Sequence, residues 1–132
     1  ELEISEKTSV RLLRAWIVAD AGEVVDPSGL TAQLEGGFIQ AASWSLYESV
    51  SYDSQGITSR DWESYPIIRF DNVPEVRTLL VDRPGEPFLG AGEAVGGPAG
   101  GAIANAIYRA SGLRLSQMPF DSHRIRSTAL SE

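Results

Sequence analysis

The chain has 132 residues and a formal net charge of −7, with no cysteine and one histidine. Its length suits one domain with a modest core, its acidic balance argues against a nucleic-acid-binding surface, and no apolar run reaches the roughly 20 residues of a membrane-spanning helix. Without cysteine, and with His123 as its one histidine, the chain cannot ligate an iron–sulfur cluster through thiolates or build a multi-histidine metal site.

The first half of the chain predicts a strand followed by a long helix. Residues 10–19, VRLLRAWIVA, are apolar and β-branched and predict the strand, which ends at the turn sequence DAGEVVDPSG. Asp26 is the predicted N-cap of the helix, with Pro27 at its first position. The apolar stripe of the helix comprises Leu30, Leu34, Phe38 and Ala41, widened by Ile39, Ala42 and Leu46. Gly36 and Gly37 each cost about 1 kcal/mol relative to alanine in a helix interior, so we expect close packing at both.

The second half predicts a hairpin, two strands and a second helix. Residues 47–62 hold two short extended runs around DSQG, which predict a β-hairpin. The runs YPIIRF (65–70) and EVRTLLVD (75–82) predict strands. The second helix is predicted to start at Pro98 and stop at Gly112, with a buried face of Ile103, Ile107 and Ala110. Residues 121–132 predict a short helix or a frayed end. The expected fold is α+β, a single domain over residues 1–132 with mixed strands and two main helices.

The stretch LGAGEAVGGPAGG, residues 89–101, places Glu93 inside a run of glycines ahead of the second helix. Glycine lets the backbone lie close to a ligand or another segment. A phosphate site is disfavoured, because Val95 stands where a dinucleotide fingerprint needs glycine or alanine and no Lys-Ser or Lys-Thr pair follows. A carboxylate in a partly desolvated glycine loop is a candidate general base. An exposed loop acid and a cap for the following helix are the two other interpretations.

Gln33, His123 and a group of aromatic residues are the other candidates. Gln33 is an amide on a largely apolar helix: it suits the polar edge of a ligand, or else faces solvent. His123 is expected to be a solvated surface residue. The aromatic side chains Trp44, Tyr47 and Tyr52 suit core packing, which is the commoner reason for such residues, or the lining of an aromatic substrate pocket.

Three motifs follow one another along the chain: DAGEVVDPSGLTAQLEGGFIQAASWSLYE, GITSRDWESYPIIRF and PGEPFLGAGEAVGGPAGGAIANAIYRASGLRL. In this order they resemble the C-terminal end of the molybdenum-binding subunit of the xanthine oxidase and aldehyde oxidase family. The likeness covers about residues 10–122. GITSRDW and the alanine after GAGE are most similar to the branch of the isoquinoline 1-oxidoreductase β-subunit. The resemblance implies the C-terminal part of a molybdopterin-binding domain, in a chain that is a fragment or one piece of a split subunit.

The resemblance also implies a chemistry. Members of the family hydroxylate a carbon next to a ring nitrogen, or an aldehyde carbon, with oxygen taken from water. By resemblance, Glu93 of GAGE is the catalytic base, Gln33 of AQLEGG hydrogen-bonds the molybdopterin, and Gly92 lets the backbone approach the ligands of the metal. The implied cofactor is molybdenum–molybdopterin in the complete subunit. Its dithiolene sulfurs hold the metal, so this chain is expected to supply no metal ligand.

The partners implied by the resemblance are the remainder of the molybdenum subunit and a separate small iron–sulfur subunit, which alone carries the clusters. The isolated chain is therefore expected to be inactive. The implied substrate is a small heteroaromatic compound or an aldehyde, and no nucleic-acid partner is expected. The expected compartment is the cytoplasm or the periplasm. The alternative is a non-catalytic module whose exposed apolar helices form an assembly surface. We expect such helices to make the isolated chain self-associate.

Overall fold

The computed structural model describes residues 1–5 and 8–130. The elements, in chain order, are β1 (Leu2–Ile4), β2 (Val10–Leu12), β3 (Arg14–Asp20), α1 (Pro27–Leu46), β4 (Tyr52–Asp53), β5 (Gly56–Ile57), the 3₁₀ helix η1 (Phe70–Asn72), β6 (Glu75–Val81), α2 (Gly96–Ser111) and α3 (Ser122–Ala129). This mixture of strands and helices is the α+β fold expected from the sequence. The predicted tail helix is α3, and residues 131–132 of that prediction lie outside the described residues. None of the helices in the described part is long and apolar enough to cross a membrane.

The single strand predicted over residues 10–19 is two strands with different partners. β2 pairs with β1 in an antiparallel hairpin, whereas β3 pairs in parallel with β6. The change of partner occurs at Leu13, whose N–H donates to the carbonyl of Glu1 at 2.9 Å. The prediction of one continuous strand was wrong because composition shows that a run is extended but not which strand lies beside each half of it.

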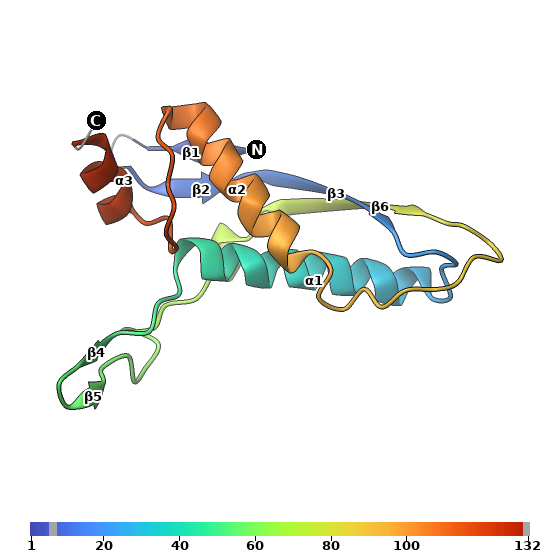
Figure 1. Ribbon diagram of the computed structural model, residues 1–132, viewed down its shortest axis with the longest axis horizontal. Helices are drawn as coiled ribbons and strands as arrows, with labels where there is room; N and C mark the ends of the chain where they lie inside the picture. The colour runs from blue at the N-terminus through green and yellow to red at the C-terminus, as the bar shows by residue number, and fades with distance from the viewer. Residues whose placement is uncertain (6–7, 131–132) are drawn as a thin grey trace.

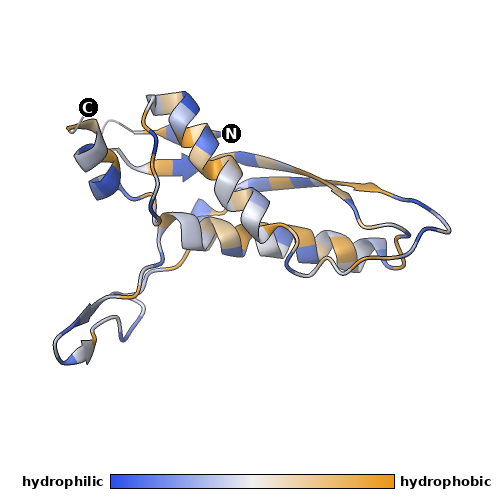
Figure 2. Ribbon diagram, viewed as in Figure 1, coloured by the Kyte–Doolittle hydropathy of each residue, from blue (hydrophilic) through white to orange (hydrophobic). Residues whose placement is uncertain are grey.

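Strands β3 and β6 form a β–α–β arrangement with α1 in the connection between them (Figure 1). The pairing runs from Arg14 beside Glu75 to Asp20 beside Val81. Exposed residues alternate with buried or half-buried ones along both strands, the pattern of a sheet with one covered face, and Figure 2 shows hydrophilic and hydrophobic residues in each strand. Helix α1 packs against the sheet on that face. On the other face, Trp16 and Leu79 are exposed.

Helix α1 begins as the sequence predicts and forms the centre of the core. The Asp26 side chain accepts a hydrogen bond from the N–H of Gly29 at 3.0 Å, which caps the first turn. The buried apolar residues of α1 are Leu34, Phe38, Ala41, Ala42 and Leu46. A Cβ on Gly37 would lie 2.8 Å from Val95 Cγ1, which confirms the close packing expected there. Nothing lies within 4 Å of the corresponding position on Gly36, so the same expectation was wrong for Gly36.

Helix α2 crosses α1 obliquely (Figure 1) and starts at Gly96, two residues ahead of the predicted Pro98. Gly112 ends it with a φ of 79°, the left-handed conformation expected of a glycine stop. Ile103 and Ile107 are buried as predicted. Ala110 is exposed, contrary to the prediction, because the last turn of α2 extends beyond its crossing with α1.

Residues 48–72, which we call the arm, project from the end of α1 (Figure 1). The arm contains the predicted hairpin, with β4 and β5 paired around the DSQG turn. The strand predicted at residues 65–70 was wrong, because no described strand lies beside this run. The N–H of Ile68 donates instead to Ser43 Oγ of α1 at 3.0 Å, and this bond ties the base of the arm to the body.

Candidate functional site

One face of α1 carries two amides, a glycine and a tryptophan in place of the apolar stripe. They follow steps of four, three and four residues, which keeps them on one side of the helix: Gln33, Gly37, Gln40 and Trp44. Gln33, Gln40 and Trp44 are exposed, and Gly37 is half-buried. This face lies beneath the glycine-rich loop that precedes α2, as the lining of the hollow described below shows.

The loop of residues 82–95 is attached at its start to the turn that follows β3. The N–H of Leu89 donates to the carbonyl of Ala21 at 2.9 Å, and that of Glu23 donates to the carbonyl of Glu86 at 3.3 Å. Gly22 has a φ of 72°, and a Cβ there would overlap the carbonyl oxygen of Pro87. Only glycine meets both demands. The turn that follows β3 thus holds the loop that follows β6, the parallel partner of β3.

The end of the same loop is anchored against α1 by Val95. Val95 is buried and contacts the face of α1 at Gly37, where the missing side chain makes room for it. Val95 lies within a tight turn over residues 93–96, in which the N–H of Gly96 donates to the carbonyl of Glu93 at 3.2 Å. The backbone of Glu93 is therefore held in place while its side chain is left exposed.

The three predicted site residues lie together. A Cβ on Gly92 would be 3.8 Å from Gln33 Oε1, so the amide of α1 lies directly beside the backbone of the loop. Glu93 follows Gly92 in the chain and lines a hollow of about 260 Å³. The lining residues are Gly37, Gln40, Trp44, Gly92, Glu93, Gly96 and Gly97. Gly92 also lines a second hollow of about 180 Å³, which Gln33 shares, and so separates the two.

The Glu93 carboxylate is available to a ligand. Within residues 1–5 and 8–130 no hydrogen bond or ion pair reaches it. It does not cap α2, whose N-cap position is Val95 and has no side-chain hydrogen bond. That excludes the helix-cap interpretation for the described chain. The side chain is exposed, so the partial desolvation expected from the glycine-rich sequence is not provided by these residues alone.

Of the remaining candidates, Trp44 lies at the hollow of Glu93, whereas His123, Tyr47 and Tyr52 lie elsewhere. His123 is exposed on α3, as expected, and lines a separate hollow with Arg126. The aromatic group does not form one pocket: Trp44 lines the hollow of Glu93, whereas Tyr52 is 80% exposed on the arm. Tyr47 ends α1, where burial raises its pKa. Gln40 was missed by the sequence reasoning, although its spacing from Gln33 places it on the same helix face.

Comparison with known proteins finds similarity to molybdopterin-binding domains. Residues 1–74 match the family model of the molybdopterin cofactor-binding domain. A nicotinate dehydrogenase chain of Pseudomonas putida is 37% identical over 118 residues, which cover 89% of this chain and 10% of that protein. The β-subunit of isoquinoline 1-oxidoreductase from Brevundimonas diminuta is 33% identical over 115 residues, covering 87% of this chain and 14% of that protein.

Among solved structures, quinoline 2-oxidoreductase from Pseudomonas putida 86 has the same fold over 96% of this chain. The TM-score is 0.82 at 23% sequence identity, and the match covers 17% of that chain. Aldehyde oxidoreductase from Desulfovibrio gigas matches 91% of this chain and 14% of its own, with a TM-score of 0.77 at 23% identity. The chain thus spans only a small part of the relatives that it matches.

Proposed function

Because the chain belongs to the molybdopterin cofactor-binding domain family, we propose that it forms one wall of the active site of a molybdenum hydroxylase. Within that family it is part of a molybdenum-binding subunit of the xanthine oxidase type. Glu93 is the general base of that site. The observation that supports this best is the Glu93 carboxylate, which no described residue pairs with and whose backbone is held in a turn, at the edge of a hollow walled by glycines, Gln40 and Trp44. The family resemblance read from the sequence is confirmed.

The residues present fit such a cofactor. Gly92, Gly96 and Gly97 expose backbone without side chains along the hollow, which leaves room for a bulky group. Gln33 and Gln40 offer amide donors and acceptors to its polar edges. Within the described residues, no cluster of three or more His, Cys, Asp or Glu side chains is arranged to hold a metal ion. That suits a metal whose ligands belong to the cofactor.

Each residue has a distinct part in the proposed reaction. When bound, the molybdenum cofactor supplies the two-electron oxidation of the substrate carbon. The carboxylate of Glu93 accepts the proton that is released as oxygen from water is transferred to that carbon. Gln33 would hydrogen-bond the pterin, and Gly92 would allow the backbone to approach it. Segments outside this chain cover the hollow and exclude water from Glu93.

The names of the relatives support a substrate class. Nicotinate, isoquinoline and quinoline, in the names of three of them, are nitrogen heterocycles. The proposed substrate is a small N-heteroaromatic compound, with an aldehyde as the alternative. The proposed partners are the remainder of the molybdenum subunit and a small iron–sulfur subunit. The second of these removes the electrons, because this chain has no cysteine to hold a cluster.

The replacement Glu93→Gln in the complete enzyme tests the assignment of the base. It keeps the shape of the side chain and removes its basicity, so kcat should fall by about 10² to 10⁴-fold while the molybdenum content stays unchanged. Glu86→Gln is the matched control, because Glu86 is an exposed carboxylate of the same loop that lies outside the hollow. Turnover of the Glu93→Gln enzyme within a few-fold of that of the control would contradict the proposal.

The replacement Gln33→Ala tests the cofactor contact. The loss of one hydrogen bond, worth about 0.5–1.5 kcal/mol net, should lower molybdenum occupancy and reduce turnover less than Glu93→Gln does. Gln55→Ala, at the tip of the hairpin in the arm, is the control. Unchanged molybdenum content and an unchanged rate would show that Gln33 is only a surface residue.

A further inference from the structure

Six of the 17 exposed large hydrophobic side chains in the described part of the chain lie on the arm, more than on the helices, and four others lie on the open face of the β3–β6 sheet. Those of the arm are Val50, Tyr52, Ile57, Trp62, Ile67 and Phe70. Tyr52 is 80% exposed, Trp62 is 70% exposed and Phe70 is 100% exposed. Helix α1 packs against α2 and the β3–β6 sheet. Such a concentration of exposed apolar residues is typical of an interaction surface.

The arm has its own internal structure although the body does not cover it. The N–H of Thr58 donates to the carbonyl of Ser51 at 2.8 Å, across the base of the hairpin. Beyond the hairpin, the Asp61 carboxylate accepts from Ser64 Oγ at 2.7 Å and from the N–H of Ser64 at 2.9 Å. These bonds order the backbone that carries the apolar side chains, which lowers the ordering cost of binding.

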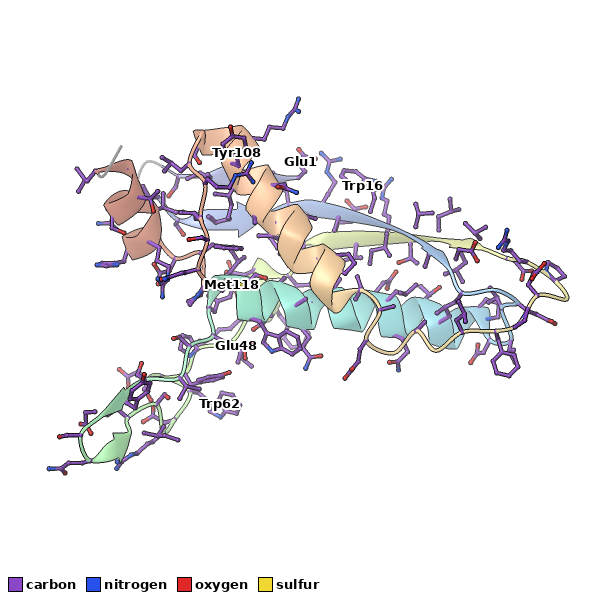
Figure 3. The ribbon with its side chains drawn as sticks, viewed as in Figure 1. Glu1, Trp16, Glu48, Trp62, Tyr108 and Met118 are labelled. Atoms are coloured by element: carbon purple, nitrogen blue, oxygen red, sulfur yellow. The ribbon has the colours of Figure 1, made fainter. Side chains whose placement is uncertain are left out.

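The arm is fastened to the body at its base. Tyr65 Oη donates to Glu48 Oε2 at 2.7 Å and so joins the returning segment to the departing one. The bond from Ile68 to Ser43 then joins the returning segment to α1. In Figure 3 Trp62 lies on the projecting arm, whereas Trp16 lies on the sheet, well apart from it. The arm therefore presents its hydrophobic residues away from the core.

The charge of the arm indicates what kind of surface it meets. The arm has five acidic residues, Glu48, Asp53, Asp61, Glu63 and Asp71, against two arginines, Arg60 and Arg69. No ion pair in the described residues involves any of them. A surface with apolar pockets and a basic rim complements this distribution. A second copy of the chain is disfavoured as the partner, because it carries the same acidic arm and the same net charge of −7.

We propose that the arm is a docking strap, which packs Tyr52, Trp62 and Phe70 against an apolar, basic-rimmed surface of the remainder of the molybdenum subunit. The relatives are long enough to contain such a surface outside the matched segment, since this chain spans only 10% and 14% of the two curated relatives described above. The identity of the partner rests on the proposed function. The burial of the arm is measured without turnover, so either proposal can fail while the other stands.

Hydroxyl-radical footprinting of the complete subunit tests the strap on the unmodified protein. The oxidation rates of Tyr52, Trp62 and Phe70 are read by mass spectrometry and compared with those in a synthetic peptide of residues 48–72. We expect the oxidation of all three to be largely lost in the complete subunit, to the same extent at low and high protein concentration. Rates equal to those in the peptide would overturn the proposal. Protection that disappears on dilution would overturn the partner and assign a second copy instead.

A pair of variants tests whether the apolar contacts hold the strap. Trp62→Ser in the complete subunit should restore the oxidation of Tyr52 and Phe70 and open the arm to limited proteolysis. Ser54→Ala, at the hairpin tip, should leave both readouts unchanged. If Trp62→Ser leaves Tyr52 and Phe70 protected, the aromatic side chains do not hold the arm and the strap is refuted. Retained turnover in Glu93→Gln would instead refute the base and leave these footprints unaffected.

Discussion

Replacing Gly37 by alanine probes the contact that fixes the Glu93 loop on α1. A Cβ at this position would lie 2.8 Å from Val95 Cγ1, well inside ordinary van der Waals contact. Val95 is only 7% exposed, and its β-branched side chain has few alternative rotamers that would relieve the clash. The added methyl group must therefore displace either the loop or the helix.

The magnitude follows from two opposing effects. Alanine is favoured over glycine in a helix interior by about 1 kcal/mol, and overpacking a filled contact costs about 1–3 kcal/mol. Gly36→Ala is the matched control, because it has the same gain in helix propensity and nothing within 4 Å to clash with. The propensity gain cancels between the two variants. Gly36→Ala should therefore exceed Gly37→Ala in free energy of unfolding by about 1–3 kcal/mol, the overpacking cost alone.

Chemical denaturation of the two variants, followed by circular dichroism, measures this difference. In the complete enzyme, Gly37→Ala should also lower kcat/KM more than Gly36→Ala does, because Val95 lies two residues from Glu93. Equal free energies of unfolding would refute the reasoning, since they would show that the loop yields to the methyl group without cost.

Three further predictions concern stability. Asp26→Ala removes the cap on α1 and should cost about 0.5–2 kcal/mol of unfolding free energy, whereas Asp26→Asn should retain most of it; equal losses would exclude the cap. Ile107→Ala, at a fully buried position, should cost about 2–5 kcal/mol, and a loss below that of an Ile103→Val control would contradict the packing of α2. The hydrogen bonds from Ser64 lower the pKa of Asp61. Their contribution is complete above the usual carboxyl pKa and is lost as the pH falls through the lowered value. On acidification, the exchange rate of the Ser64 amide, corrected for the intrinsic pH dependence of exchange, should therefore rise in the unmodified protein and not in Asp61→Asn. Identical pH profiles for the two proteins would refute this.

Local signals in the sequence predicted the elements that local chemistry determines. Asp26 and Pro27 mark the start of α1, and Gly112 marks the end of α2, because caps and positive φ depend on the residue at that position. Pairing partners were not predicted. The parallel contact of β3 with β6 joins segments from opposite halves of the chain, and no local pattern specifies such a contact. The run at residues 65–70 has strand composition, but no strand in the described part of the chain lies beside it.

The candidate site was predicted in a different way. The glycine-rich sequence singled out Glu93 as a candidate base, but it was the family resemblance that grouped Glu93 with Gln33 and Gly92. The structure brings Gln33 and Gly92 into proximity. Helical spacing from Gln33 would have indicated Gln40 and Trp44 without any resemblance. The hollow that Gln40 and Trp44 share with Glu93 could not be predicted in this way. It forms because the loop folds back over α1, which depends on the contact between Gly37 and Val95.

The position of the arm within the β–α–β unit has an evolutionary consequence. The arm is inserted between α1 and β6, and it leaves and rejoins the body at sites tied together by Glu48 and Tyr65. Doubling the length of such an insertion costs only about 0.6 kcal/mol in chain entropy, and it leaves the register of β6 against β3 unchanged. The length of this segment can therefore change while the loop that carries Glu93 keeps its place, so the surface that the arm contacts can diverge without altering the chemistry.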